Sequence, residues 1–206
     1  MVLNMLMLNL PVEKIGGEMY ELLTMANRTT EDVFSLLDNL LKWTKSQIGN
    51  LNVVYQDVDA VEVVDSVIDV FNMVAGLKKI TIREEKPEKL PVCTDIDMLK
   101  TIIRNLLSNA IKFSNENSEV LVKMEEQGDT MVVSVKDSGC GIDEEGQQKL
   151  LHTDTHFSTF GTNNEEGSGL GLLLCQDFAV KSGGKLWFTS KKGEGSTFYF
   201  SIPLKK

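Results

Sequence analysis

Residues 101–114, "TIIRNLLSNAIKFS", combine a strongly apolar helical pattern with a row of polar side chains. Asn105, Ser108, Asn109 and Lys112 recur at i, i+3, i+4 and i+7, which places them on one helix face. A solvated face is the ordinary interpretation, but asparagine is a poor helix former, and two of them one turn apart suggest a binding role. Their carbonyl oxygens suit Mg²⁺, and the lysine suits a phosphate oxygen.

The stretch 132–143, "VVSVKDSGCGID", places Asp137 at the end of a predicted strand, with Gly139 and Gly141 after it. The two glycines let the backbone turn sharply and let a flat ring approach closely. A carboxylate only accepts hydrogen bonds, so it would bind the exocyclic amine of adenine and repel O6 of guanine. Asp137 therefore predicts a preference for ATP over GTP, with a plain turn as the alternative interpretation.

The stretch "GSGLGL", residues 167–172, puts three glycines before a predicted helix. Amides at a glycine-rich helix start bind anions well, so this run is a candidate for phosphate contact. It matches neither a dinucleotide-binding fingerprint nor a P-loop. The polar segment 142–166 before it, with Phe157 and Phe160 as anchors, is interpreted as a functional lid.

Periodicity around these motifs predicts helices packed on one face of a mostly antiparallel sheet, an α+β fold of the two-layer α/β sandwich type. Residues 87–95, which carry two prolines, are expected to form a loop, and Gly76 to cap the first helix. The predicted helices are 61–79, 96–113 and 171–183; the predicted strands are 80–85, a hairpin of 119–126 and 130–137, and a second hairpin over 185–203 that turns at 193–195.

Residues 17–48 contain no proline and carry apolar or small residues at heptad spacing from Met19 to Trp43, with a second stripe beside them. Two stripes suit a helix buried on a wide face, as in a four-helix bundle. Residues 1–10 are expected to end an earlier antiparallel helix. Residues 1–53 are therefore predicted to form a helical hairpin that dimerises, and residues 54–206 a second domain. A long helix packed on its own domain is the alternative.

The chain has 206 residues, 42% of them hydrophobic, and a net charge of −9. An acidic surface repels the phosphate backbone, which argues against a nucleic-acid partner. Three scattered cysteines without a CxxC pair fit reduced thiols in a cytoplasmic protein. The apolar first ten residues are too short to span a bilayer and lack the features of a signal peptide, so no membrane span is expected.

The order of the motifs is more specific than any one of them. "NLLSNAIKFS", "DSGCGI", "HFSTFGT" and "GSGLGL" resemble, in this order, the N, G1, F and G2 boxes of bacterial sensor histidine kinases. That family belongs to the ATPase superfamily shared with gyrase, heat-shock protein 90 and MutL. The resemblance covers residues 92–206, and "LLDNLLKWTKSQIG", residues 36–49, is similar to the second helix of the family's dimerization and histidine-phosphotransfer domain.

The resemblance implies a protein-histidine kinase that binds Mg-ATP and transfers the γ-phosphoryl group to a histidine, for relay to an aspartate of a response-regulator receiver domain. It also implies a homodimer formed through the N-terminal helices, and a cytoplasmic fragment of a membrane-anchored sensor. The implied catalytic residues are Asn105, Asn109 and Lys112, with both asparagines at the metal. The implied nucleotide contacts are Asn109, Lys112, Phe113, Asp137, Gly139, Gly141, Ile142, Phe157, Phe160, Gly167, Ser168, Gly169, Leu170 and Gly171.

The chain departs from the family pattern in its histidines. The family's phosphoacceptor histidine is followed by an acidic residue, whereas His152 and His156, the two histidines here, are not. We expect the acceptor upstream of Met1, or lost, so that this chain binds ATP without phosphorylating itself. A dimeric signalling scaffold that uses ATP only as a switch is the alternative. A clamp like MutL is disfavoured, because Asn105 stands where such proteins carry the glutamate that activates water.

Overall fold

The apolar helix that carries the polar stripe lies at the centre of the domain. In the computed structural model it is α5 (Ile96–Phe113), and it packs against one helix on each side. Leu99, Ile102 and Leu107 on this helix have no exposed surface. The side chain of Asp95 begins the helix by accepting hydrogen bonds from the backbone amides of Asp97 and Met98, each at 3.0 Å.

The structure describes residues 52–150, 161–162 and 169–205. It also describes residues 19, 22–23, 26, 30, 33, 37–38 and 40–44, and each residue of this second group is helical. The remaining elements, in chain order, are β1 (Gln56–Asp59), α4 (Ala60–Leu77), β2 (Thr81–Glu85), β3 (Pro91–Thr94), β4 (Glu119–Gln127), β5 (Thr130–Lys136), α6 (Glu144–Lys149), α7 (Gly171–Lys181), β6 (Lys185–Lys191) and β7 (Gly195–Pro203). The predicted helical hairpin over residues 1–53 lies largely outside the described residues and stays a prediction.

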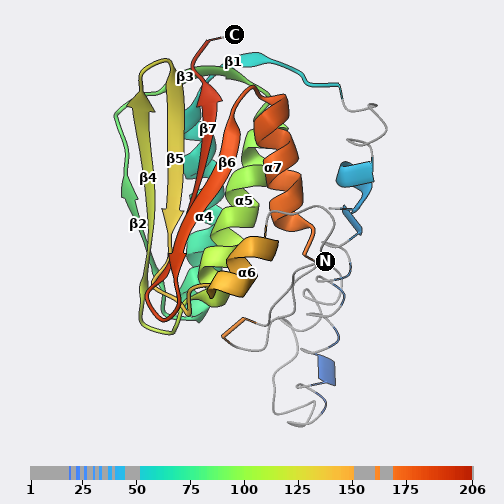
Figure 1. The fold of residues 1–206 in the computed structure, drawn as a ribbon, viewed down its shortest axis with the longest axis vertical. Helices are drawn as coiled ribbons and strands as arrows, with labels where there is room; N and C mark the ends of the chain where they lie inside the picture. The colour runs from blue at the N-terminus through green and yellow to red at the C-terminus, as the bar shows by residue number, and fades with distance from the viewer. Residues whose placement is uncertain are drawn as a thin grey trace.

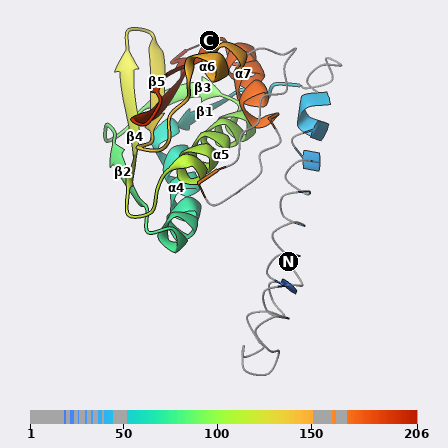
Figure 2. The ribbon, with the colours of Figure 1, turned by 60° about the horizontal axis from the view of Figure 1, so that its bottom comes forward.

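Five strands form one sheet in the order β2-β4-β5-β7-β6, in which β2 and β4 are parallel and the other neighbours are antiparallel. Helices α4, α5 and α7 cover one face of this sheet (Figure 1, and from another side Figure 2). Alternate strand residues such as Val122, Val133 and Phe200 point into the layer between sheet and helices, and they are at most 1% exposed. The predicted two-layer fold is confirmed for the described domain.

The prediction of a loop over residues 87–95 is wrong in part. Residues Pro91–Thr94 form β3, which pairs antiparallel with β1 in a separate two-stranded sheet. The backbone amide of Ala60 donates to the carbonyl oxygen of Leu90 at 2.9 Å and extends this pairing to the start of α4. The partner strand lies far away in the sequence, so the local proline signal was misleading.

Two helix boundaries also differ from expectation. Gly76 lies inside α4, and Lys78 caps the helix, while Lys79 adopts the positive φ of 55° that was expected of a glycine. Near its start, the predicted lid segment contains a short helix, α6. The side chain of Asp143 caps this helix by accepting a hydrogen bond from the backbone amide of Gly146. By contrast, α7 ends as predicted, with Ser182 as its cap and Gly183 at a φ of 84°.

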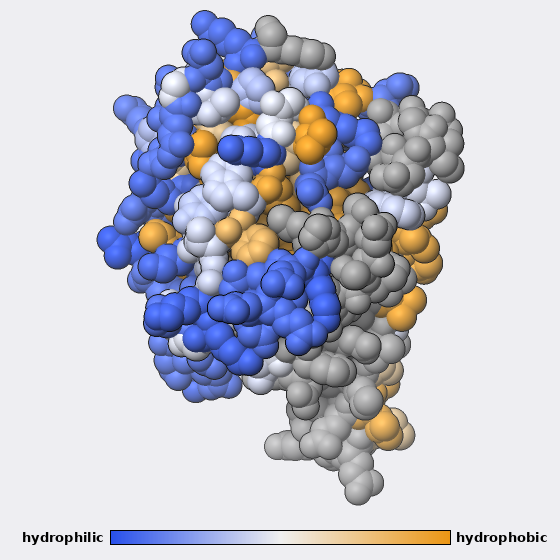
Figure 3. Space-filling model, in the orientation of Figure 1, coloured by the Kyte–Doolittle hydropathy of each residue, from blue (hydrophilic) through white to orange (hydrophobic). Residues whose placement is uncertain are grey.

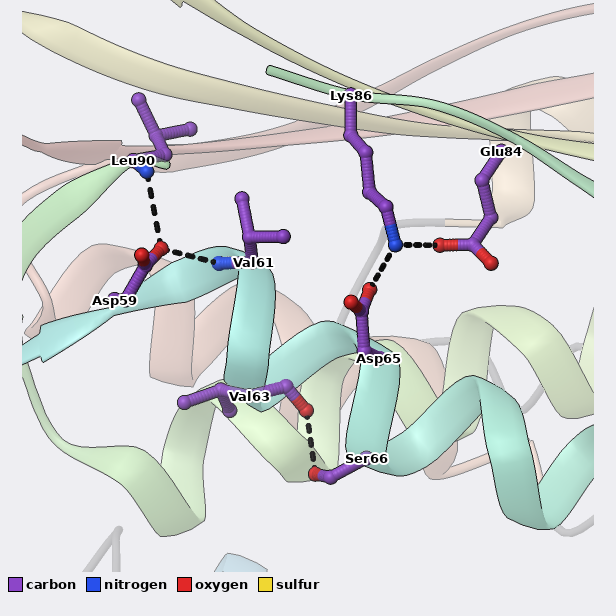
Figure 4. A network of polar contacts seen from close by, with 8 residues as sticks. All are labelled: Asp59, Val61, Val63, Asp65, Ser66, Glu84, Lys86 and Leu90. Atoms are coloured by element: carbon purple, nitrogen blue, oxygen red, sulfur yellow. Dashed lines mark hydrogen bonds and ion pairs between the residues drawn. The ribbon is translucent and has the colours of Figure 1, made fainter. Parts of the chain in front are cut away.

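The start of α4 is held by one carboxylate. Oδ1 of Asp59 accepts hydrogen bonds from the backbone amides of Val61 and Leu90, each at 3.0 Å (Figure 4). The same side chain therefore caps the helix and ties it to the segment before β3. Further along α4, the ammonium group of Lys86 bridges Asp65 at 2.5 Å and Glu84 at 2.6 Å.

Replacing Asp59 by alanine is expected to destabilise the domain by about 2 kcal/mol, because a helix cap and a second amide both lose their acceptor. The midpoint of thermal unfolding should fall by about 5 °C. Asp65→Ala is the control, since it breaks only a solvent-exposed ion pair and should cost less than about 1 kcal/mol. Equal losses in the two variants would contradict the role of Asp59.

Candidate functional site

The predicted polar stripe on α5 faces away from the core. Asn105, Asn109 and Lys112 are half-buried and Ser108 is exposed, while the apolar residues between them are buried. The stripe therefore neither packs into the core nor lies fully in solvent. This position suits side chains that contact a ligand lying along the helix.

The carboxamide of Asn105 is oriented by its own helix. Its Nδ2 atom donates to the carbonyl oxygen of Thr101 at 2.9 Å. Its Oδ1 atom lies so close to α7 that a Cβ atom on Gly171 would be 2.6 Å from it. A side chain at residue 171 would therefore displace the Asn105 carboxamide, and with glycine there the amide oxygen stays available as an acceptor beside the start of α7.

The two asparagines fit a magnesium ion. The side chain of Asn109 makes no hydrogen bond within the described part of the chain, and the carbonyl oxygen of an amide is a suitable ligand for a hard cation. Among the residues that the structure describes, no group of three or more His, Cys, Asp or Glu side chains is arranged to hold a metal ion. Magnesium often keeps only one or two protein ligands and takes the rest from phosphate and water, so two carboxamides suffice.

Asp137 is held rigidly in a buried position directly after β5. Only 4% of its surface is exposed, and its Oδ1 atom accepts hydrogen bonds from the amides of Gly139 at 2.9 Å and Ser196 at 3.2 Å. Within the described residues Oδ2 receives no hydrogen bond, which leaves it for a ligand. Burial raises the pKa of the Asp137 carboxyl, and the two amide hydrogen bonds oppose this shift.

Two serines that sequence reasoning missed complete this end of the site. The hydroxyls of Ser190 and Ser196 are hydrogen-bonded at 2.8 Å, and the Ser190 hydroxyl accepts from the amide of Ile142 at 2.8 Å. The antiparallel register of β5 and β7, with Lys136 opposite Thr197, brings Ser196 beside Asp137. The stretch "GEGSTF" was available as a signal, since a hydroxyl follows the turn glycine.

The glycines after Asp137 let neighbouring backbone segments approach closely, and their expected contact with the ring stays a prediction. A Cβ atom on Gly139 would lie 2.1 Å from the carbonyl oxygen of Phe113, and one on Gly141 would lie 2.0 Å from that of Lys191. Gly141 also has a φ of +62°, which side-chain-bearing residues rarely adopt. These glycines therefore allow backbone to pack on backbone, and they lock the Asp137 loop between the end of α5 and the β6–β7 turn.

The second half of the glycine run begins α7. Gly169 has a φ of +68°, Leu170 is buried, and the helix starts at Gly171 without a side-chain cap. A helix start without a side-chain cap is a place where backbone amides can bind an anion. The other predicted residues of this region lie outside the described residues: Phe157, Phe160, Gly167, Ser168, and the histidines His152 and His156.

The described motifs converge on one region. The amide of Cys140 donates to the carbonyl oxygen of Phe113 at 3.4 Å, so the Asp137 loop rests on the end of α5, and Gly171 rests against Asn105 in the middle of that helix. The result is a buried acceptor beside the end of α5, a lysine in the last turn of that helix, carboxamides further back along it, and the start of α7 beside them. Such an order matches a nucleotide, with the base at the carboxylate and the phosphates at the cationic and amide groups.

Comparison with protein-family models matches residues 94–206 to the histidine kinase-, DNA gyrase B- and HSP90-like ATPases. The chain belongs to this ATPase family. Among curated relatives of this ATPase, it is 30% identical over 171 residues to the adaptive-response sensory kinase SasA of Rippkaea orientalis. It is 27% identical over 186 residues to the sensor histidine kinase WalK of Bacillus subtilis. The matches cover 82% and 89% of the chain but 43% and 30% of the relatives, so the chain spans less than half of their length.

Solved structures agree with this assignment. The catalytic domain of histidine kinase ThkA superposes with a TM-score of 0.64 at 29% identity, over 74% of this chain and 97% of that one. The histidine kinase AdeS of Acinetobacter baumannii, at 19% identity, shares the fold with a TM-score of 0.71 over 92% of this chain. The described domain is thus an ATPase domain of the histidine-kinase type. None of its described helices combines the length and apolar character that a membrane span requires.

Proposed function

We propose that the chain is the catalytic core of a two-component sensor histidine kinase, which binds Mg-ATP and transfers the γ-phosphoryl group to a histidine. The observation that carries this proposal is the convergence of Asp137, the polar stripe of α5 and the uncapped start of α7 on one region. Each of the three meets a different part of the same ligand. A metabolite without phosphates would leave the lysine and the helix amides unused.

The base would bind at Asp137. Its free Oδ2 atom accepts a hydrogen bond from the exocyclic amine of adenine, whereas the O6 atom of guanine would oppose acceptor to acceptor. The fixed Oδ1 atom cannot turn away, because two backbone amides hold it. Ile142, Phe113 and the glycines beside them form the surroundings of the ring.

The phosphates would lie along α5 towards α7. Asn105 and Asn109 would hold the ion, Lys112 would contact a phosphate oxygen, and the amides of Gly169 and Gly171 would receive the remaining charge. A bound Mg²⁺ ion neutralises the charge that develops on the phosphoryl oxygens. Because in-line phosphoryl transfer needs little covalent help from the protein, positioning and charge neutralisation account for the catalysis.

The acceptor is a protein side chain rather than water. The polar stripe of α5 holds two carboxamides, a hydroxyl and a lysine, and none of these can take a proton from water. A hydrolytic enzyme needs a carboxylate at this place. The acceptor in this proposal is a histidine of a dimerization domain, and the phosphoryl group passes from there to an aspartate of a receiver domain.

The N-terminal helix would pair with a second copy of the chain. Among its described residues, the large apolar side chains of Met19, Leu22, Val33, Leu37, Leu40 and Leu41 are exposed. Blue, hydrophilic residues cover the left side and lower front of the molecule in Figure 3. Large apolar side chains are also exposed on α4, at Val70, Met73, Val74 and Leu77. A homodimer would remove the apolar side chains of the N-terminal helix from water. The solved complex of ThkA with the response regulator TrrA supports a receiver domain as the second partner.

The proposal predicts binding and transfer that can be measured separately. Calorimetric titration with a non-hydrolysable ATP analogue should show binding that strengthens when Mg²⁺ is present. ATP labelled at the γ-phosphate should then label a second polypeptide that supplies a phosphotransfer domain with its acceptor histidine, and should leave this chain unlabelled. Binding without transfer would favour the signalling scaffold, and the absence of binding would overturn the proposal.

A further inference from the structure

A buried lysine joins three segments at the end of α5. Lys78, the cap of α4, is only 7% exposed. Its ammonium group donates hydrogen bonds to the carbonyl oxygens of Ile111 at 3.0 Å and Lys112 at 2.9 Å, and to the hydroxyl of Thr162 at 2.6 Å. Burying an ammonium group is costly unless it is hydrogen-bonded, so these partners explain how the position is tolerated.

The location of this ammonium group is electrostatically favourable. The last carbonyls of a helix have no partner within the helix, and they carry the negative end of its dipole. In α5 the two carbonyls at Ile111 and Lys112 receive the cation, while the next one, at Phe113, receives the amide of Cys140. The charge of Lys78 thus stabilises the turn of α5 that carries Asn109 and Lys112.

Thr162 is fastened to the same turn by independent bonds. Its amide donates to the carbonyl oxygen of Lys112 at 3.1 Å, and its hydroxyl donates to that of Ser114 at 2.8 Å. The hydroxyl oxygen also accepts from Lys78. Lys78 and Thr162 therefore share the carbonyl of Lys112, and moving either one would shift the backbone of the residue expected to touch phosphate.

We propose that Lys78 is a positioning residue for the phosphate half of the nucleotide: by holding Thr162 on the last turn of α5, it sets the place of Lys112 and Asn109. This inference rests on the proposed binding of ATP. The carboxylate expected to hold the adenine half is fixed by other groups, because Asp137 accepts from the amides of Gly139 and Ser196 and shares no bond with Lys78. Its loop meets α5 only at the next carbonyl, that of Phe113. Losing Lys78 should therefore affect ATP and adenosine differently.

The first test is Lys78→Met, which keeps the length of the side chain and removes its charge and its donors. Affinity for ATP with Mg²⁺ should fall about tenfold, as expected for the loss of hydrogen bonds from a charged group, while affinity for adenosine changes by less than about twofold. Both can be measured by displacement of a fluorescent ATP analogue. Lys79→Met is the matched control: its side chain is 69% exposed and 4.0 Å from Glu116, so both affinities should stay unchanged.

The second variant, Thr162→Val, tests the same contact if the Lys78→Met protein does not fold. It removes only an exposed hydroxyl and leaves the bonds from Lys78 to the helix intact. It should lower the affinity for ATP but not that for adenosine. In the double variant with Lys78→Met the two losses of ATP affinity should not add, since both act through one contact.

The possible outcomes separate this inference from the proposed function. Equal losses of affinity for ATP and adenosine in Lys78→Met would mean that Lys78 is purely structural. An unchanged ATP affinity in Thr162→Val would mean that the contact between Lys78 and Thr162 does not position the phosphate site. Either result overturns the inference while wild-type binding leaves the proposed function standing. A wild-type chain that does not bind ATP would overturn both.

Discussion

Replacing Asp137 by asparagine is expected to weaken ATP binding by about 100-fold, as measured by calorimetry. The new amide has one oxygen and one donor, whereas the site needs two acceptors. If the oxygen stays with the amides of Gly139 and Ser196, the donor faces the adenine amine. If the amide turns over, the donor faces those two backbone amides instead. Both orientations lose a buried hydrogen bond.

The same variant should gain relative affinity for GTP, because an amide donor can meet O6 of guanine. It should not unfold. Burial raises the pKa of Asp137, so its contribution to stability is greatest below the pKa of the unfolded chain and falls as pH rises through the raised value. Asparagine carries no charge and removes this cost at neutral pH.

Asp143→Asn is the control for the charge change. Asp143 is exposed, caps α6 and pairs with Lys192 at 2.9 Å, so ATP affinity should change by less than about twofold. The result that contradicts the assignment is an Asp137→Asn protein that binds ATP as tightly as the wild type.

Replacing Gly141 by alanine is expected to destabilise the domain by about 3 kcal/mol, from left-handed strain and overpacking together. The added Cβ atom would lie 2.0 Å from the carbonyl oxygen of Lys191, and the φ of +62° disfavours any side chain. For a chain of this length the midpoint of thermal unfolding should fall by about 9 °C.

Gly128→Ala separates strain from crowding. Gly128 has nearly the same φ, +61°, but a Cβ atom there would meet nothing within 4 Å. Its substitution should cost only the strain, about 1 kcal/mol. If the two alanine variants had the same midpoint of thermal unfolding, the close packing of the Asp137 loop on the β6–β7 turn would not matter for stability.

The parts of the fold that follow local rules could be predicted from the sequence. The helical spacing of Asn105, Asn109 and Lys112 put them on one face, and the structure confirms that this face is the half-buried one. Both predicted hairpins of the main sheet were also confirmed, because strand alternation and turn residues are neighbours in the chain. Where a distant segment decides, as with β3 and its partner β1, the prediction was wrong.

By itself, the order of the motifs along the sequence indicated the ATPase family, through its resemblance to sensor histidine kinases. Backbone periodicity, a local property, placed the polar side chains on one helix face. Only the tertiary structure decided that the backbone amide of Ser196 donates to Asp137, that Gly139 and Gly141 let backbone approach backbone, and that the ammonium group of Lys78 binds the last turn of α5. These contacts join residues far apart in the chain. Their existence depends on how the layers pack, which no short stretch of sequence specifies.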